Sequence, residues 1–301
     1  MFKPIKEAWA SSSKKSPASP PLSPVYGMGS YDVDEELAIV TSDLYDSMKL
    51  VQSDFVSAEH YNPDAAYLPF RRYLVDWMSD VGEQFNLHQT TIHTSILYLD
   101  KIFREQNGAV SPHRQKWQLL ATACITCASK YEEAEEDCPP IPELLEVTKL
   151  RSAGHTSLSF RDGECEVLEY LNWTLRAVCP LHVIGYYLSK GVTFEEDRWQ
   201  GRKLIQKIPK YIKKYAEFFC NLTLQNYSFQ KYDPTLLASA IVMASRVALN
   251  VEPKWRPELN VLSGYDEESI TECFEHVFKY YEEQFPDHGN RSKSPKNVTD
   301  I

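Results

Sequence analysis

The sequence predicts an all-α protein with two successive five-helix bundles, an N-terminal helix and flexible tails. Apolar residues recur at helical spacing along most of the chain between residues 34 and 281. Two segments, 119–128 and 236–249, are apolar or small on nearly every side, as in a helix surrounded by other helices. The similar short sequences Cys127-Ala-Ser-Lys-Tyr and Met243-Ala-Ser-Arg-Val occupy equivalent positions in or next to these two segments, which indicates an internal repeat.

Composition restricts the class of protein. With 301 residues and 43% hydrophobic content, the chain is long enough to form two cores of ordinary size. It has no apolar run long enough to cross a bilayer, and residues 1–21 lack an apolar signal core, so neither secretion nor membrane insertion is expected. Seven cysteines are scattered among helical patterns, which indicates a reducing compartment and no disulfide framework.

The charge argues against a nucleic-acid partner. The formal net charge is −10, and phosphates repel such a surface except at a local basic patch. The nearest approach to a patch is a set of four lysines: Lys207, Lys210, Lys213 and Lys214. At that spacing they are expected to form the solvated face of a helix.

Both ends of the chain are predicted to be disordered, over residues 1–31 and 286–301. The first is rich in Ser and Pro and has too few hydrophobic residues to offset the entropy of ordering. Ser-Pro dipeptides begin at Ser16, Ser19, Ser23 and Ser294, and none has a basic residue three positions after the serine. They are either targets of proline-directed kinases or chance features of Ser/Pro-rich segments.

A single N-terminal helix is expected within residues 32–56. Its helical stretch, 34–51, opens with Asp34, Glu35 and Glu36, whose charges suit a helix N-terminus. Its apolar set needs a partner surface and consists of Leu37, Val40, Leu44, Met48 and Val51.

The first bundle is expected within residues 57–178. Its helices are predicted at 67–86, 88–106, 111–133, 143–148 and 159–171, with the third in the centre. The first helix carries an apolar stripe that other elements are expected to cover: Phe70, Tyr73, Leu74, Trp77, Met78 and Val81.

The second bundle is expected within residues 179–285. Its helices are predicted at 181–188, 202–223, 236–249, 255–262 and 267–281, and again the third, which Pro234 opens, is central.

The enzyme hypothesis finds little in this sequence. There is no glycine-rich phosphate loop, nucleophile elbow or His-Glu zinc motif. Cys124 and Cys127 have the spacing of half a zinc site, but no second ligand pair follows, so both thiols are expected in a core or an interface. An acidic run is expected to form a solvated helix cap and consists of Glu132, Glu133, Glu135, Glu136 and Asp137.

Five positions, distributed over four of the predicted helices, instead carry a family resemblance: Arg71, Asp100, Leu119, Lys130 and Glu164. They stand within or near the texts Phe70-Arg-Arg-Tyr-Leu-Val-Asp-Trp-Met, Tyr98-Leu-Asp-Lys-Ile-Phe, Ala128-Ser-Lys-Tyr-Glu-Glu and Leu171-Asn-Trp-Thr-Leu. Together these resemble the cyclin box. A second box of similar design follows, in residues 255–259 and in Ser263-Gly-Tyr-Asp-Glu-Glu-Ser-Ile-Thr-Glu-Cys. The resemblance covers about residues 32–283 and is closest in kind to cell-cycle cyclins of the A and B types.

The resemblance implies a kinase regulator with no catalysis, cofactor or metal of its own. In the family, the residues matching Arg71 and Asp100 form an internal ion pair. Those matching Lys130 and Glu164 grip the movable helix of a cyclin-dependent kinase. Apolar contacts around the grip map to Cys127, Tyr131, Leu168, Trp173 and Leu175. The helix at 34–51 matches a family helix that contacts the kinase. An equally favoured alternative is that it only covers the second hydrophobic core.

A second surface implied by the resemblance captures Arg-x-Leu peptides of substrates and inhibitors. Its matching positions are Phe70, Tyr73, Trp77, Asp80, Trp117 and Gln118, of which three rings are bulkier than usual and could instead fill the groove. No arginine precedes Arg71, so a mitotic degradation signal is not evident. The family implies the nucleus and cytoplasm. Two alternatives remain: a cyclin-fold transcription or scaffold factor, and an unrecognised all-helical enzyme.

Overall fold

The computed structural model describes residues 35–106 and 114–286, with the backbone alone at 35–42 and 114–115. The predicted tails, apart from Pro286, and all four Ser-Pro dipeptides lie outside these ranges, and the side chains of Leu37 and Val40 are not among those described. No helix in the described ranges is long and apolar enough to cross a membrane.

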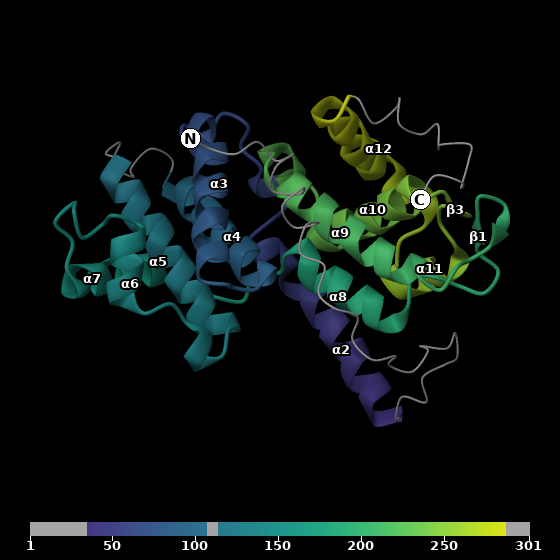
Figure 1. Cartoon of the computed structure of the whole chain (residues 1–301), viewed down its shortest axis with the longest axis horizontal. Helices are drawn as coiled ribbons and strands as arrows, with labels where there is room; N and C mark the ends of the chain where they lie inside the picture. Colours follow the sequence, from purple (N-terminus) through teal and green to yellow (C-terminus); the bar gives the residue numbers. More distant parts are fainter. Residues whose placement is uncertain (1–34, 107–113, 287–301) are drawn as a thin grey trace, which may run out of the picture.

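Two helical bundles lie side by side (Figure 1), as the sequence predicts. The first contains α3 (Leu68–Gln84), α4 (Gln89–Gln106), α5 (Arg114–Glu132), α6 (Ile141–Val147) and α7 (Ser157–Tyr170). The second contains α8 (Pro180–Lys190), α9 (Ile208–Leu224), α10 (Pro234–Ala248), α11 (Pro257–Ser263) and α12 (Glu267–Gln284). Short 3-10 helices are Gln52–Asp54, Ala58–His60, Glu135–Asp137 and Tyr227–Lys231. The all-α class with five helices per bundle is confirmed for the described residues.

The central helices are α5 and α10. Residues 120–129 of α5 and 237–246 of α10 are buried without interruption. Helix α4 is equally buried from 91 to 103, although its apolar residues at helical spacing form a single stripe: Ile92, Ile96, Leu99 and Phe103. It packs against α3 and α5 of its own bundle and against α8 of the other, and Figure 1 shows it between the two halves. Contact on both sides therefore buries its polar residues too.

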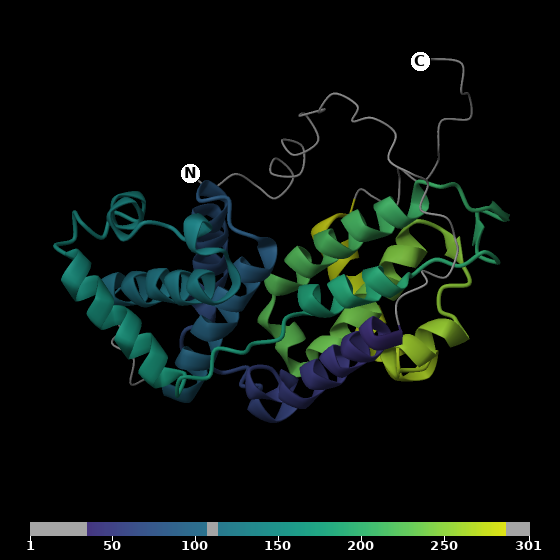
Figure 2. The ribbon, with the colours of Figure 1, turned by 90° about the horizontal axis from the view of Figure 1, so that it is seen from below.

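The N-terminal helix, α2 (Glu35–Val51), lies along the second bundle beside α8 (Figure 2). The buried residue that fixes α2 to this bundle is Tyr45, which is not among the apolar residues predicted for the contact face. The Tyr45 hydroxyl donates to the carbonyl of Ser263 over 2.7 Å and lies 2.8 Å from the hydroxyl of Tyr187. The predicted contact residue Leu44 is 47% exposed, so its assignment to the buried face is wrong.

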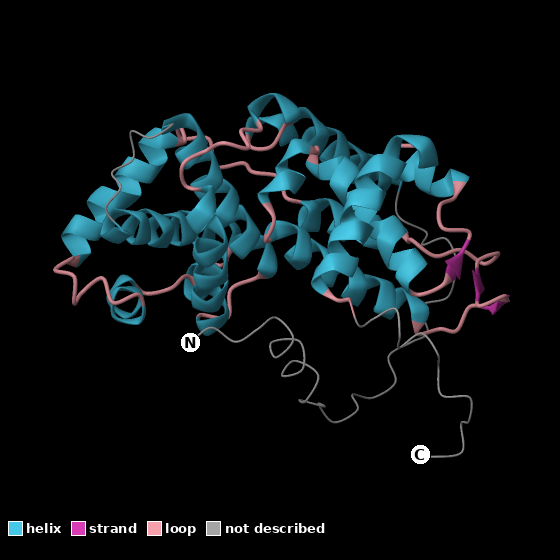
Figure 3. Ribbon diagram, turned by 90° about the horizontal axis from the view of Figure 1, so that it is seen from above, coloured by secondary structure: helices cyan, strands magenta, loops and turns pink. Residues whose placement is uncertain are grey.

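The predicted start of the helix at 202 is also wrong. Arg202–Lys203 is strand β2, which pairs with β1 (Arg198–Trp199), and β1 pairs with β3 (Val251–Glu252) in a small antiparallel sheet (Figure 3). Helix α9 begins at Ile208 because Pro209 follows it, and proline, which has no N–H, is accommodated only in the first turn.

The predicted stripe on α3 is partly exposed. Phe70 is 48% exposed and Tyr73 is 62% exposed, so the expectation that other elements cover them is wrong. The buried face instead runs through Arg71, Val75 and Met78. A charged residue occupies this face because, as described below, a carboxylate of α4 neutralises it.

Candidate functional site

Arg71 and Asp100 form a buried ion pair that ties α3 to α4. The guanidinium makes two contacts of 2.8 Å, Nε to Oδ1 and Nη2 to Oδ2. Its Nη1 donates to the carbonyl of Leu224 in the second bundle, and the hydroxyl of Tyr67 donates to Asp100. Burial alone would lower the pKa of Arg71, but the Asp100 carboxylate outweighs it and the pKa is raised. The pair is therefore a structural joint between the bundles.

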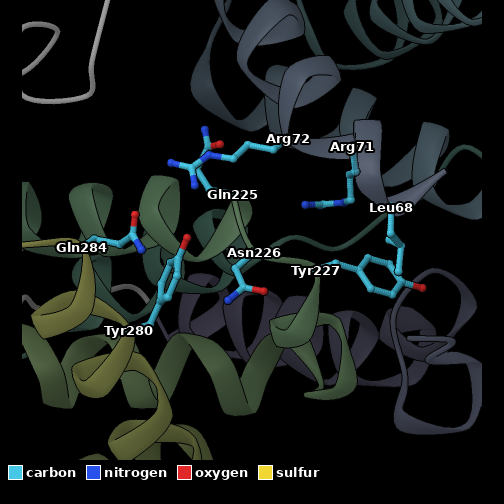
Figure 4. Close-up of a pocket in the computed structure, with 8 residues that line it drawn as sticks. All are labelled: Leu68, Arg71, Arg72, Gln225, Asn226, Tyr227, Tyr280 and Gln284. Atoms are coloured by element: carbon cyan, nitrogen blue, oxygen red, sulfur yellow. The ribbon is translucent and has the colours of Figure 1, made fainter. Parts of the chain in front are cut away.

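A cavity of about 330 Å³ lies beside Arg71, between the two bundles (Figure 4). Its wall consists of Leu68, Arg71, Arg72, Gln225, Asn226, Tyr227, Tyr280 and Gln284. This lining contains no carboxylate, histidine or thiol, and Arg71 already donates to Asp100 and Leu224. The cavity thus holds no nucleophile with an adjacent base, and it gives no support to the all-helical enzyme.

Lys130 and Glu164 lie on one face of the first bundle, at the end of α5 and in the middle of α7. The ammonium Nζ is 2.5 Å from the carboxylate Oε1. The lysine side chain is 54% exposed and the glutamate side chain only 9%. The arrangement presents an accessible cation over a carboxylate that the bundle holds in place.

Close packing of α5 on α7 fixes the separation of this pair. A Cβ built on Gly163 would lie 3.3 Å from Cγ of Leu119, so glycine lets the two helices approach next to Glu164. Leu119, one of the five sequence positions that carry the resemblance, forms the opposing surface. Helical periodicity does not single out Gly163, although a glycine inside a helical pattern can mark a packing requirement.

The other five residues assigned to this face differ in exposure. Cys127 is buried, Leu168 and Leu175 are half-buried, and the rings of Tyr131 and Trp173 are 50% and 70% exposed. Trp173 has φ of +60° and its neighbour Asn172 has φ of +50°, a left-handed backbone that costs non-glycine residues roughly 1–2 kcal/mol each. A strained turn that projects an indole into solvent is typical of a binding surface.

The acidic run beyond Lys130 is not one solvated cap. Oε1 of Glu133 accepts from the backbone N–H of His88 over 2.7 Å and from the hydroxyl of Thr91 over 2.6 Å, at the start of α4. Glu132 accepts from the hydroxyl of Thr94. The prediction is wrong for these two because α5 ends against the N-terminus of α4, whose free N–H groups attract carboxylates. The other three, Glu135, Glu136 and Asp137, are exposed.

The two cysteines with zinc-like spacing belong to the core. Cys124 and Cys127 are both buried, and burial raises the pKa of each thiol. In the described ranges, no group of three or more His, Cys, Asp or Glu residues has the arrangement of a metal site.

The six positions assigned to peptide docking lie on α3 and at the start of α5. The ring of Phe70 meets Trp117 edge-on at 5.3 Å, and Trp117 packs on Phe103. Trp77 is half-buried, while Tyr73 and Asp80 are exposed. The amide Nε2 of Gln118 donates to the carbonyl of Thr148, so this donor is already engaged.

Comparison with known proteins gives consistent results. The model of the cyclin N-terminal domain matches residues 43–176, and that of the cyclin C-terminal domain matches residues 202–298. Cyclin-J of Xenopus laevis is 30% identical over 72% of this chain and 56% of its own length. G2/mitotic-specific cyclin S13-6 of Glycine max is 26% identical over 87% of this chain and 53% of its own.

Among solved structures, the viral cyclin from herpesvirus saimiri has a similar fold. It superposes with a TM-score of 0.59 at 18% identity, over 80% of this chain and 98% of the viral chain. The present chain spans only a little more than half the length of the two curated relatives described above.

Proposed function

The chain belongs to the cyclin family, and from that premise we propose that it binds and activates a cyclin-dependent Ser/Thr kinase in cell-cycle control. Cyclins are regulatory subunits and not catalysts. The observation that carries the proposal is the pair Lys130 and Glu164, 2.5 Å apart on two packed helices with the ammonium half-exposed. The exposed rings of Tyr131 and Trp173 supply the kind of aromatic anchor that dominates interface energy.

The pair suits the ends of a partner helix. A helix leaves free N–H groups at one end and free carbonyls at the other, so a carboxylate and an ammonium can each bind one end. In the free chain the two side chains bind each other. Because the ammonium is largely solvated, exchanging this contact for a partner gives up only about 0–1 kcal/mol.

The mechanism we propose is positional. Binding moves the kinase C-helix inward, so that its glutamate pairs with the lysine that orients ATP, and repositions the activation segment. This chain contributes binding free energy, and the kinase carries out the chemistry.

Affinity capture of the tagged chain from dividing cells tests this function. We expect the eluate to contain a cyclin-dependent kinase and to phosphorylate Ser/Thr substrates, with a tagged A-type cyclin captured in parallel as the positive control. An eluate without any such kinase, while the control retains its own, would favour the cyclin-fold transcription or scaffold factor.

We further propose that the α3 surface around Trp77 docks Arg-x-Leu peptides of substrates or inhibitors. The exposed carboxylate of Asp80 can pair with the peptide arginine, and the exposed rings of Phe70 and Tyr73 offer apolar area to the leucine. The engaged amide of Gln118 leaves recognition to α3.

Trp77→Ala is expected to lower kcat/KM for an Arg-x-Leu substrate about tenfold, the effect of losing roughly 1.4 kcal/mol of docking energy. Kinase assays on the reconstituted complex measure it, beside a substrate without the motif, which should be unaffected. Asp80→Asn, at an exposed position, should act in the same direction, whereas Tyr211→Ala on α9 should not. Equal rates for wild type and both α3 variants would reject docking at this surface.

A further inference from the structure

A thiol, an imidazole and a carboxylate contact one another in succession where the two bundles meet. Sγ of Cys179 is 3.3 Å from Nδ1 of His182, and Nε2 of the same ring is 3.5 Å from Oε1 of Glu132. Cys179 and His182 belong to the start of the second bundle, whereas Glu132 ends α5 of the first. The kinase-binding proposal uses none of these three residues.

The local backbone orients the thiol and the ring. Cys179 immediately precedes α8, so its sulfur lies at a helix N-terminus, a position that favours a thiolate. The backbone N–H of Cys179 donates to Nδ1 of His182 over 3.2 Å. In the neutral ring the Nδ1 lone pair therefore faces both this N–H and the Cys179 sulfur, which is 3.3 Å away, and Nε2 carries the hydrogen that faces Glu132.

The carboxylate supports a positive charge on the ring. Burial would raise the pKa of Glu132, but hydrogen bonds from His182 and Thr94 outweigh it and lower the pKa. Its second oxygen, Oε2, is buried and has no hydrogen-bond partner among the described residues. The neighbouring Cys179 side chain and the Glu132 carboxylate, opposed by burial, raise the pKa of His182 to about 11. The ring between the sulfur and the carboxylate is thus a strong proton acceptor.

We propose that Cys179 is a peroxide-reactive thiol, activated by His182 as base and positioned by Glu132 across the seam between the bundles. Nδ1 takes the thiol proton, and the thiolate sulfur attacks one oxygen of hydrogen peroxide. An S–O bond forms while the O–O bond breaks, and the departing hydroxide takes the proton from the ring and leaves as water. The sulfur is oxidised by two electrons to sulfenic acid, and the peroxide is reduced.

The burial of the thiol selects for a small oxidant. Cys179 is only 1% exposed, and the neighbouring His182 side chain is 23% exposed. A cavity of about 40 Å³ near the same seam is lined in part by Pro180 and Cys220, and its lining does not include Cys179. Because so little of the Cys179 thiol is exposed, a small oxidant such as hydrogen peroxide reaches it more readily than a bulky maleimide does.

Two other cysteines are built-in controls. Cys220 is as deeply buried as Cys179, and Cys165 is exposed. In the described part of the chain, neither has a histidine nitrogen within hydrogen-bond distance, and burial raises the pKa of Cys220 well above its usual range. A difference between Cys179 and Cys220 therefore reports on the base and not on access.

The proposal is tested by timed treatment of the folded full chain with hydrogen peroxide, which catalase then removes. The chain is next unfolded in the presence of dimedone, which traps sulfenic acid at every cysteine, and the adducts are measured by peptide mass spectrometry. We expect the adduct at Cys179 to form at least tenfold faster than at Cys220 or Cys165, while a maleimide labels Cys165 first. His182→Gln and Glu132→Gln should each slow oxidation of Cys179 at least fivefold, with circular dichroism to check folding. Equal rates at Cys179 and Cys220 in the wild type, which needs no variant, would overturn the proposal. So would unchanged oxidation of Cys179 in folded His182→Gln.

Discussion

The double replacement Lys130→Ala, Glu164→Ala is expected to weaken binding of the kinase subunit at least thirtyfold. Truncating charged groups that are hydrogen-bonded across an interface typically costs about 2–5 kcal/mol, and 2 kcal/mol corresponds to roughly thirtyfold in Kd. Folding should hardly change, because removing both partners leaves no unpaired charge and the lysine is 54% exposed. The double variant should therefore change the affinity for the kinase subunit without changing the free energy of unfolding of this chain.

Titration calorimetry with the purified kinase subunit and a urea melt of each chain measure the two effects. The matched control is Lys254→Ala, Glu267→Ala, which removes a second ion pair of 2.8 Å whose side chains are 47% and 46% exposed. This pair lies at the far end of the second bundle, and its loss should leave the Kd unchanged. If both double variants bind like the wild type, the proposed grip is wrong.

Asp197→Ala is expected to destabilise the second bundle by about 3–5 kcal/mol, a large part of the roughly 5–15 kcal/mol that stabilises a typical domain. Asp197 and Arg246 are completely buried, and their two contacts are both 2.9 Å. The carboxylate also accepts from Arg256 and from the backbone N–H of Phe194. Its loss would leave the Arg246 guanidinium buried and unneutralised, with an Nε that already has no partner among the described residues.

Urea denaturation followed by circular dichroism measures this change. Glu258→Ala removes an exposed partner of the same Arg256 and should destabilise the chain far less than Asp197→Ala does. Asp197→Leu combined with Arg246→Met should destabilise less than Asp197→Ala alone, since the pair leaves no orphan charge. A loss below 1 kcal/mol in Asp197→Ala would contradict the structural role assigned to this ion pair.

The hydrophobic periodicity of the sequence is sufficient to predict the helices and their order along the chain. The sequence predicts that 119–128 and 236–249 are central, because a helix that is apolar or small on every face is stable only when other elements cover all of its faces. Helix ends were less accurate where a single proline decides them, as Pro209 does for α9.

The candidate site could be predicted residue by residue only through the cyclin resemblance. Lys130 and Glu164 are 34 residues apart, and nothing in their local patterns says that they meet. The physical basis of the meeting is the glycine contact between α7 and α5, which no helical periodicity contains. Whether the pair grips a kinase stays a prediction.

Local sequence thus determined what depends on neighbours in the chain: helix type, helix order, the covered central helices and the tails' composition. Tertiary structure alone decided which polar residues are buried. Five residues read as ordinary polar positions, and the side chain of each is buried against a partner distant in sequence: His93, Thr94, Glu133, Asp197 and Arg246. The reason is physical, because burying a charge is stable only when a specific opposite charge or donor meets it, and that meeting is set by packing.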